Sequence, residues 1–206
     1  MILGKVSDGV VGVILAGGLA SRMGGGDKTL KSLGKKTILE YVIDRLSPQV
    51  TNIVLNANGN PLRFAKFKIP VIHDQTDQFL GPLAGVLSGL DWAYEKGFSH
   101  IVTVAADTPF FPPSLVQMLW VALLNSESQI ALAATKEKGS KKIIRHPTFG
   151  LWPVDLRSDL KNSLNLGVRK VVLWTETHKH VDVLFKIETD DPFFNVNTYQ
   201  DLDIAQ

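Results

Sequence analysis

The sequence predicts an α/β domain with three layers, in which helices cover both faces of a mostly parallel central sheet. Two observations favour this class. Short apolar runs alternate with amphipathic helical patterns along most of the chain, and these runs are almost continuously apolar, which is typical of strands buried on both faces. The chain has 206 residues, of which 45% are hydrophobic. Because this length supports one large core, we expect a single domain over residues 1–206.

Strands are expected wherever β-branched or apolar residues dominate a short run. The expected strands are residues 10–15, 52–58, 69–74, 100–107, 129–135, 146–152 and 180–185. The first run, VVGVIL, is too short to span a bilayer and lacks the basic flank and cleavage pattern of a secretion signal. We therefore expect a buried strand there and no membrane segment.

Helices are expected where apolar residues recur every three or four positions. This spacing marks residues 37–46, 81–97 and 112–124. In the second segment, Leu83, Val86 and Leu90 share one face, and Gly97 then favours the end of the helix. The basic segment at 135–145, TKEKGSKKIIR, is expected to be a mobile loop that either closes over a substrate or projects into solvent.

Charge and cysteine content narrow the class of partner. The chain has 22 Lys and Arg against 20 Asp and Glu, a net charge of +2, and no block of like charge. This balance argues against a nucleic-acid partner and favours a small molecule. The chain contains no cysteine, which rules out a disulfide framework and a thiolate metal site and fits a reducing compartment such as the cytoplasm.

A glycine-rich segment, VILAGGLASRMGGGDK at residues 13–28, overlaps the end of the first expected strand. Gly17 and Gly18 fall where this strand ends, and glycine lets backbone N–H groups approach phosphate oxygens. The spacing satisfies neither the Walker P-loop nor the dinucleotide G-x-G-x-x-G pattern, and a plain tight turn is the alternative for the glycines alone. Arg22 and Lys28 add two cations, which suits a triphosphate whose charge must be offset.

Asp107 stands at the carboxyl end of the apolar run at 101–105. In a parallel sheet ligands bind at this edge, and one carboxylate can hold Mg²⁺ while phosphates and water fill the other positions. The alternative is that Asp107 caps the helix expected at 112–124, although Ser114 lies nearer to its start. We expect Asp107 to be a magnesium ligand.

The motifs together resemble one enzyme family. LAGGLASRMGGGDK is similar to the signature loop of nucleotidyltransferases, and specifically of the molybdenum cofactor guanylyltransferases. VLNAN, VIHD, GPLAG, ADTPFFPP, RHPTFGLWP, GVRKVV and FNVNTYQDL follow in that family's order over nearly the whole chain. Related cytidylyltransferases and sugar-phosphate nucleotidyltransferases usually carry two alanines before the glycine, whereas Gly17 here follows Ala16 directly. The resemblance implies a Rossmann-like nucleotidyltransferase fold.

The resemblance also implies roles for residues of the glycine-rich segment. It implies that the nucleotide site is lined by Leu15, Ala16, Gly17 and Gly18. Lys28 would contact the phosphates, and Arg22 would help to neutralise the leaving pyrophosphate.

Further positions match residues that the family uses elsewhere in its site. Asn56 and Asp74 match GTP-binding positions, with helix capping and ribose binding as alternatives for Asp74. Guanine presents adjacent N–H donors that a carboxylate accepts well, which favours GTP. Asp107 matches the magnesium ligand, and Asn195 and Asn197 match a late loop associated with the acceptor pterin or the metal.

We therefore expect an enzyme that transfers GMP from GTP to molybdenum-molybdopterin, with Mg²⁺ as cofactor and pyrophosphate as the second product. The alternatives are a molybdenum cofactor cytidylyltransferase, a sugar-phosphate nucleotidyltransferase and, from another class, a nucleotide-binding adaptor without catalysis. The presence of both Lys28 and Asp107 argues against the adaptor. The expected partners are GTP, a molybdopterin-type acceptor and, transiently, cofactor-synthesis and molybdoenzyme-maturation proteins.

Overall fold

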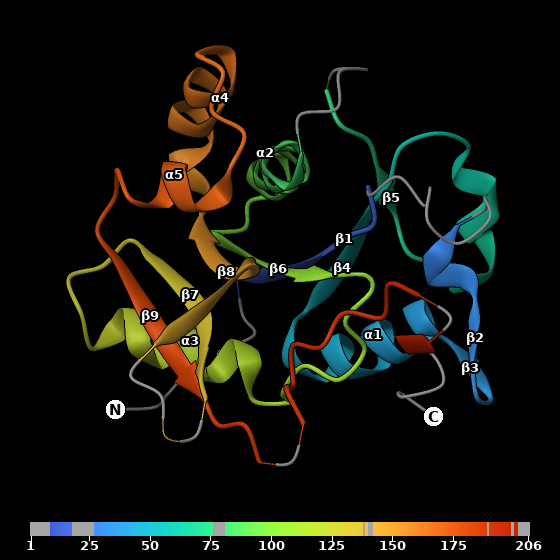
Figure 1. Cartoon of the computed structure of the whole chain (residues 1–206). Helices are drawn as coiled ribbons and strands as arrows, with labels where there is room; N and C mark the ends of the chain where they lie inside the picture. Colours follow the sequence, from blue (N-terminus) through green and yellow to red (C-terminus); the bar gives the residue numbers. More distant parts are fainter. Residues whose placement is uncertain are drawn as a thin grey trace.

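The computed structural model describes residues 9–17, 27–75, 81–137, 139, 142–188, 190–198 and 200–201. A seven-stranded sheet runs through its centre in the order β5-β4-β1-β6-β8-β7-β9 (Figure 1). Its strands are β1 (Val10–Leu15), β4 (Asn52–Asn56), β5 (Val71–Ile72), β6 (His100–Ala105), β7 (Ile130–Lys136), β8 (Ile143–Pro153) and β9 (His180–Phe185). Each of the seven expected strands therefore has a counterpart in the sheet.

The sheet is mostly parallel, as predicted. β1 pairs in parallel with β4 and β6, β4 with β5, and β7 with β9. β8 is the exception and runs antiparallel to its neighbours β6 and β7. Its amino-terminal half therefore lies toward the sheet edge at which β1, β4 and β6 end.

Helices cover both faces of the sheet, so the three layers are confirmed (Figure 1). One face carries α1 (Ile38–Leu46) and α3 (Leu115–Leu124), and the other carries α2 (Pro82–Glu95), α4 (Arg157–Asn165) and α5 (Val171–Thr175). The shorter elements are β2 (Ser32–Leu33), β3 (Lys36–Thr37) and the 3-10 helices Lys28–Leu30, Ser47–Gln49, Pro61–Phe67 and Val154–Leu156. Within the described residues, no helix has the length and apolar content needed to cross a membrane.

Each face of the sheet has its own apolar cluster. In β1, Val10 and Ile14 belong to the cluster under α1, whereas Val11 and Val13 belong to the cluster under α2. All four side chains are fully buried. This alternation explains why the strand reads as a continuous apolar run, because neither of its faces meets water.

α2 approaches the sheet closely because two of its glycines face β1. A Cβ on Gly89 would lie 2.8 Å from a Val13 methyl, and a Cβ on Gly85 would lie 2.8 Å from Leu15 Cδ2. Carbon atoms pack at about 3.5–4.0 Å, so neither position has room for a side chain. The helix begins after Gly81, whose φ of 73° is readily adopted only by glycine.

The loop expected at 135–145 is shorter than predicted. β7 continues to Lys136 and β8 begins at Ile143, and these two residues pair across a β-hairpin. The prediction was wrong at both ends of the segment, because Thr135 is a fully buried strand residue and the β-branched Ile143 and Ile144 belong to β8. Two basic residues of the segment, Lys136 and Arg145, therefore lie in strands.

Candidate active site

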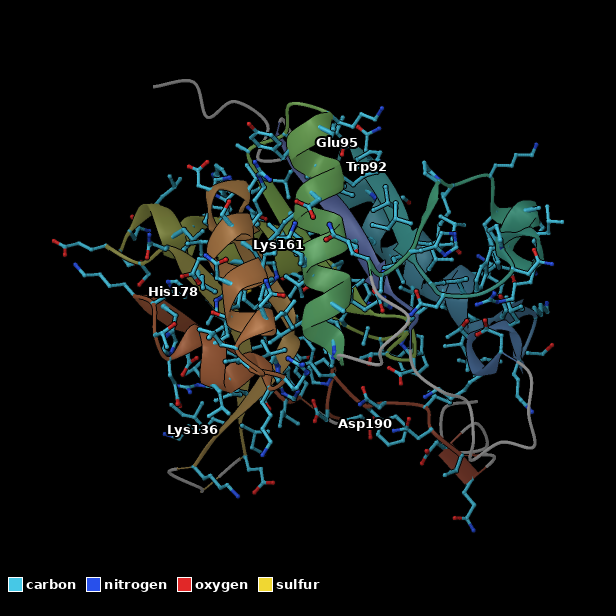
Figure 2. The ribbon with its side chains drawn as sticks, turned by 90° about the horizontal axis from the view of Figure 1, so that it is seen from above. Trp92, Glu95, Lys136, Lys161, His178 and Asp190 are labelled. Atoms are coloured by element: carbon cyan, nitrogen blue, oxygen red, sulfur yellow. The ribbon has the colours of Figure 1, made fainter. Side chains whose placement is uncertain are left out.

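A cavity of about 210 Å³ lies at the carboxyl ends of β1, β4 and β6. Its lining comes from segments far apart in the sequence: Leu15, Gly17, Asn56, Asp74, Gly81, Pro82, Ala105, Asp107, Thr148 and Asn195. The cavity borders the amino end of α2, the end away from Trp92 and Glu95 in Figure 2. Its position follows from the topology, because parallel strands end at the same edge of a sheet.

The loop that follows β1 contributes backbone atoms and the small residue Gly17 to the wall of the cavity. Leu15 and Gly17 line the cavity, and the Ala16 N–H donates to the Asn56 carbonyl oxygen at 2.8 Å. A Cβ on Gly17 would lie 3.6 Å from Asn56 Oδ1, which is an ordinary contact, so the described protein atoms alone do not require glycine there. Two other predicted residues of this loop, Gly18 and Arg22, lie outside the described residues.

Lys28 stands beside two other predicted site residues. Its Nζ donates to Asp107 Oδ2 at 2.6 Å and to Asn197 Oδ1 at 2.6 Å. Lys28 is the first residue of a 3-10 helix, which Asp27 caps by accepting from the Thr29 N–H. The structure thus brings together three predicted residues that are far apart in the sequence, while their chemical roles stay predictions.

Oxygen atoms suited to a cation gather at the same place. The Lys28 ammonium contacts both the Asp107 carboxylate and the Asn197 amide oxygen, so this position suits a positive charge. Such oxygens are also the donors that Mg²⁺ prefers, with phosphates and water as its remaining ligands. In the described part of the chain, no group of three or more His, Cys, Asp or Glu could hold a metal. Ser114 is the N-cap of α3, so the capping alternative for Asp107 is not found.

The Asp74 carboxylate is fixed by two asparagines at the end of β4. Asn56 Nδ2 donates to Asp74 Oδ1 at 2.9 Å, and Asn58 Nδ2 donates to Asp74 Oδ2 at 2.8 Å. Each carboxylate oxygen has a further lone pair, so Asp74 can still accept from a ligand. Gly81, rather than Asp74, is the N-cap of α2. Asn58 was missed, and its two-residue spacing from Asn56 was the signal that could have found it.

The late loop is tied to the loop that carries Asp107. The Val196 N–H donates to the Asp107 carbonyl oxygen at 2.8 Å. The Thr108 hydroxyl donates to Asn195 Oδ1, which places Asn195 on the cavity wall. Thr108 is fully buried and was not predicted as a site residue.

Asp201 holds the Asn197 end of the same loop. Its carboxylate accepts from the backbone N–H groups of Asn197 and Thr198, each at 2.8 Å. These hydrogen bonds, the one from Asn197 above all, hold the pKa of Asp201 below its usual value, although partial burial opposes them. The Thr198 and Asp201 spacing is that of a helix capping box, a readable signal that sequence reasoning did not use.

Thr148 reaches the cavity from the antiparallel strand β8. The register between β7 and β8 shifts so that residues 147–149 form a bulge, and Pro147 within it has no N–H to give to the ladder. Sequence reasoning missed Thr148 because it examined the carboxyl ends of strands. An antiparallel strand instead brings its amino-terminal half toward that edge.

His146 directly precedes this bulge and is expected to make stability depend on pH. Its Nε2 lies 2.8 Å from the Thr135 hydroxyl, and its ring stacks on Phe193 with a centroid distance of 4.3 Å. Burial lowers the pKa of His146 below 6.5, although the Asp191 carboxylate opposes the shift. Between the folded and unfolded pKa values the unfolded state binds more protons, so the free energy of unfolding falls as the pH drops below about 6.5.

We therefore expect His146→Gln to weaken the pH dependence of stability, measured by urea unfolding at several values from pH 7.5 down to pH 5. Burial also lowers the pKa of His100, so His100→Gln should remove another part of the same slope. Equal slopes in wild type and in the double variant would contradict this expectation.

With GTP, the substrate expected from the sequence, replacing Lys28 with Ala should raise the KM and lower turnover, because the cation beside Asp107 is lost. The expected loss in kcat/KM is on the order of 10–10³-fold. Steady-state release of pyrophosphate measures it. Lys36→Ala is the control, since Lys36 forms an exposed ion pair with Asp44; equal kcat/KM values in the two variants would exclude a special role for Lys28.

Sequence comparison identifies relatives along almost the whole chain. A family model described as the MobA-like NTP transferase domain matches residues 12–183. A molybdenum cofactor guanylyltransferase of Bradyrhizobium sp. (strain ORS 278) is 44% identical over 200 residues, which cover 96% of this chain and 92% of the relative. A protein of the same name from Rhodopseudomonas palustris (strain HaA2) is 46% identical over 197 residues, covering 94% and 89%.

Solved structures show the same fold. Molybdopterin-guanine dinucleotide biosynthesis protein A from Archaeoglobus fulgidus matches with a TM-score of 0.70 at 23% identity, over 95% of this chain and 96% of that one. The 4-diphosphocytidyl-2C-methyl-D-erythritol synthase from Anaerococcus prevotii matches with a TM-score of 0.70 at 17% identity, over 98% and 97%. These likenesses confirm the Rossmann-like nucleotidyltransferase fold. Together with the sequence matches, they show that the chain belongs to the MobA-like NTP transferases, among the molybdenum cofactor guanylyltransferases.

Proposed function

We propose that the protein transfers GMP from GTP to molybdenum-molybdopterin, forming the molybdopterin guanine dinucleotide cofactor and pyrophosphate. One observation carries the proposal: a single cavity is lined both by the fixed carboxylate of Asp74 and by Asp107, to which Lys28 is bound. The Asp74 carboxylate suits the N–H donors of guanine. Lys28 and Asp107 suit the triphosphate at the other end of GTP. Relatives at 44–46% identity that carry the name molybdenum cofactor guanylyltransferase support the choice of acceptor.

This transfer needs alignment and charge compensation rather than a strong protein base. The acceptor phosphate is already an anionic nucleophile, and one of its oxygens attacks the α-phosphorus of GTP. The bond from that phosphorus to the bridging oxygen of the β-phosphate breaks, and pyrophosphate leaves with the electron pair. Lys28 offsets the negative charge that develops on the leaving group. Asp74 holds the base, so that the α-phosphorus stays in one place.

We propose Mg²⁺ as the metal, with Asp107 as its protein ligand. The carboxylate and amide oxygens around Lys28 Nζ support this choice. When bound, Mg²⁺ would supply additional positive charge at the phosphates. The proposed location is the cytoplasm, which the absence of cysteine from the 206 residues supports. Because the product must reach other proteins, we also propose transient contacts with cofactor-synthesis and molybdoenzyme-maturation proteins.

Nucleotide binding and pyrophosphate release together test the proposed reaction. Calorimetry with Mg²⁺ should give tighter binding of GTP than of CTP. Release of pyrophosphate should require both GTP and the molybdopterin acceptor. Tighter CTP binding would favour the cytidylyltransferase alternative, and GTP binding without pyrophosphate release would favour the adaptor.

A further inference from the structure

Arg63 forms an ion pair with the residue that precedes Lys28. It lies in the 3-10 helix Pro61–Phe67, and its Nε donates to Asp27 Oδ2 at 2.9 Å. The other carboxylate oxygen of Asp27 accepts from the Thr29 hydroxyl at 2.8 Å. Lys28 therefore lies between Asp27 and Thr29, which are hydrogen-bonded to each other, and Asp27 is itself held by Arg63.

The remaining nitrogens of the same guanidinium reach the loop after β4. Arg63 Nη2 donates to the Asn58 carbonyl oxygen at 2.6 Å, and Nη1 donates to the Asn60 carbonyl oxygen at 2.7 Å. The Asn58 side chain in turn binds Asp74 twice, by donating to its carboxylate and by accepting from its N–H at 3.0 Å. Arg63 thus fixes the backbone of a residue that holds Asp74.

We propose that Arg63 is a positioning residue that couples the phosphate side of the nucleotide site to its base side. It acts on Lys28 through Asp27 and on Asp74 through Asn58. The inference rests on the proposed function, since it assumes that one nucleotide spans both sides.

The chemistry of arginine suits this bridging role. A guanidinium presents its N–H donors in a rigid plane, so it can serve a carboxylate and two carbonyl oxygens at once. The Arg63 plane also lies over the Phe64 ring at 4.4 Å, and the side chain is 31% exposed. A lysine at position 63 would keep the charge near Asp27 but would lose the fork that reaches the two carbonyl groups.

The chain offers a closely matched control at Arg157. Its guanidinium pairs with Asp91, lies over the Tyr94 ring at 3.8 Å and is 34% exposed. Arg157 and Asp91 do not line the cavity. Arg157→Ala therefore removes a similar ion pair and a similar ring contact without touching the nucleotide site.

The experiment compares Arg63→Ala, Arg63→Lys and Arg157→Ala with GTP and with ITP, whose base lacks the exocyclic amino group of guanine. We expect Arg63→Ala to lower kcat/KM for GTP on the order of 10–100-fold. We also expect it to reduce the preference for GTP over ITP, because Asn58, one of the two asparagines that hold Asp74, loses the hydrogen bond to its backbone. Arg63→Lys should have a kcat/KM and a preference for GTP over ITP between those of wild type and Arg63→Ala. Arg157→Ala should have the wild-type values of both. In the double variant Asp27→Ala/Arg63→Ala the loss of kcat/KM should be smaller than the two single losses combined, because Arg63 acts on Lys28 through Asp27.

Two results would overturn the inference: equal kinetics for Arg63→Ala and Arg157→Ala, or an Arg63→Ala variant that loses activity while keeping the wild-type preference for GTP over ITP. If Arg63→Ala does not fold, the same two criteria apply to Arg63→Lys. Failure of the proposed function is recognised separately, because wild type itself would then release no pyrophosphate from GTP and the molybdopterin acceptor.

Discussion

Replacing Asp107 with Ala should lower the rate of pyrophosphate release on the order of 10²–10³-fold or more, which is the largest kinetic effect that we expect. The carboxylate is the proposed magnesium ligand, and it also binds Lys28 Nζ at 2.6 Å. Its loss removes the expected metal and leaves Lys28 without its acidic partner. Stability should change little, because Asp107 is partly exposed and its backbone contact with Val196 does not depend on the side chain.

The measurement is turnover at several Mg²⁺ concentrations, together with thermal unfolding of the same preparations. Asp91→Ala is the matched control, since the Asp91 side chain is 22% exposed, Asp107 is 23% exposed, and both pair with a cation. Near-normal, magnesium-dependent turnover in Asp107→Ala would exclude Asp107 as the ligand.

Replacing Gly85 with Ala should weaken GTP binding on the order of 10-fold or more and destabilise the fold by about 1–3 kcal/mol. The new Cβ would collide with Asn56 Oδ1 and would lie 2.8 Å from Leu15 Cδ2. Asn56 is 2% exposed and cannot move out of the way without disturbing its hydrogen bond to Asp74. The substitution therefore acts from within α2 on the side of the cavity where we propose that the base binds.

Gly89→Ala is the control that separates the loss of stability in Gly85→Ala from the loss of GTP binding. Its Cβ would lie 2.8 Å from a Val13 methyl and 3.2 Å from Ile101 Cδ1, with no polar atom of the site among its nearest contacts. We expect a comparable loss of stability with GTP affinity close to that of wild type. Chemical unfolding and calorimetry on both variants give the comparison. Equal GTP affinities in the two variants would show that Gly85 matters only for packing.

The strands of the sheet could be predicted from the sequence because most of them consist almost entirely of apolar residues. β1 and β6 are buried on both faces, so their apolar runs left little ambiguity. The sequence did not predict α4, which buries only Leu160 and Leu164 within a polar segment, nor the reversed direction of β8. Strand direction is set by pairing with residues elsewhere in the chain, which composition does not record.

The residues that line the cavity could be predicted where a carboxylate follows the end of a strand, while their roles stay predictions. Asp74 and Asp107 each lie two residues beyond the end of β5 and β6, and both line the cavity. Arg63 and Thr148 were missed because their contribution depends on the path of the backbone: one bridges two loops, and the other enters through a bulge. Such residues become recognisable only when the loops that they join are placed in space.

Because β1 lies in the middle of the sheet, it can pair fully during translation only after both of its neighbouring strands have been synthesised. β1 lies between β4 and β6, so the partners of its two edges are Asn52–Asn56 and His100–Ala105. Both partners are synthesised long after β1, and β6 is complete only when about half of the chain has emerged. Until then an apolar strand has open edges, which favour aggregation. Assembly of the nucleotide site during translation therefore depends on delayed, long-range pairing and on protection of the nascent chain.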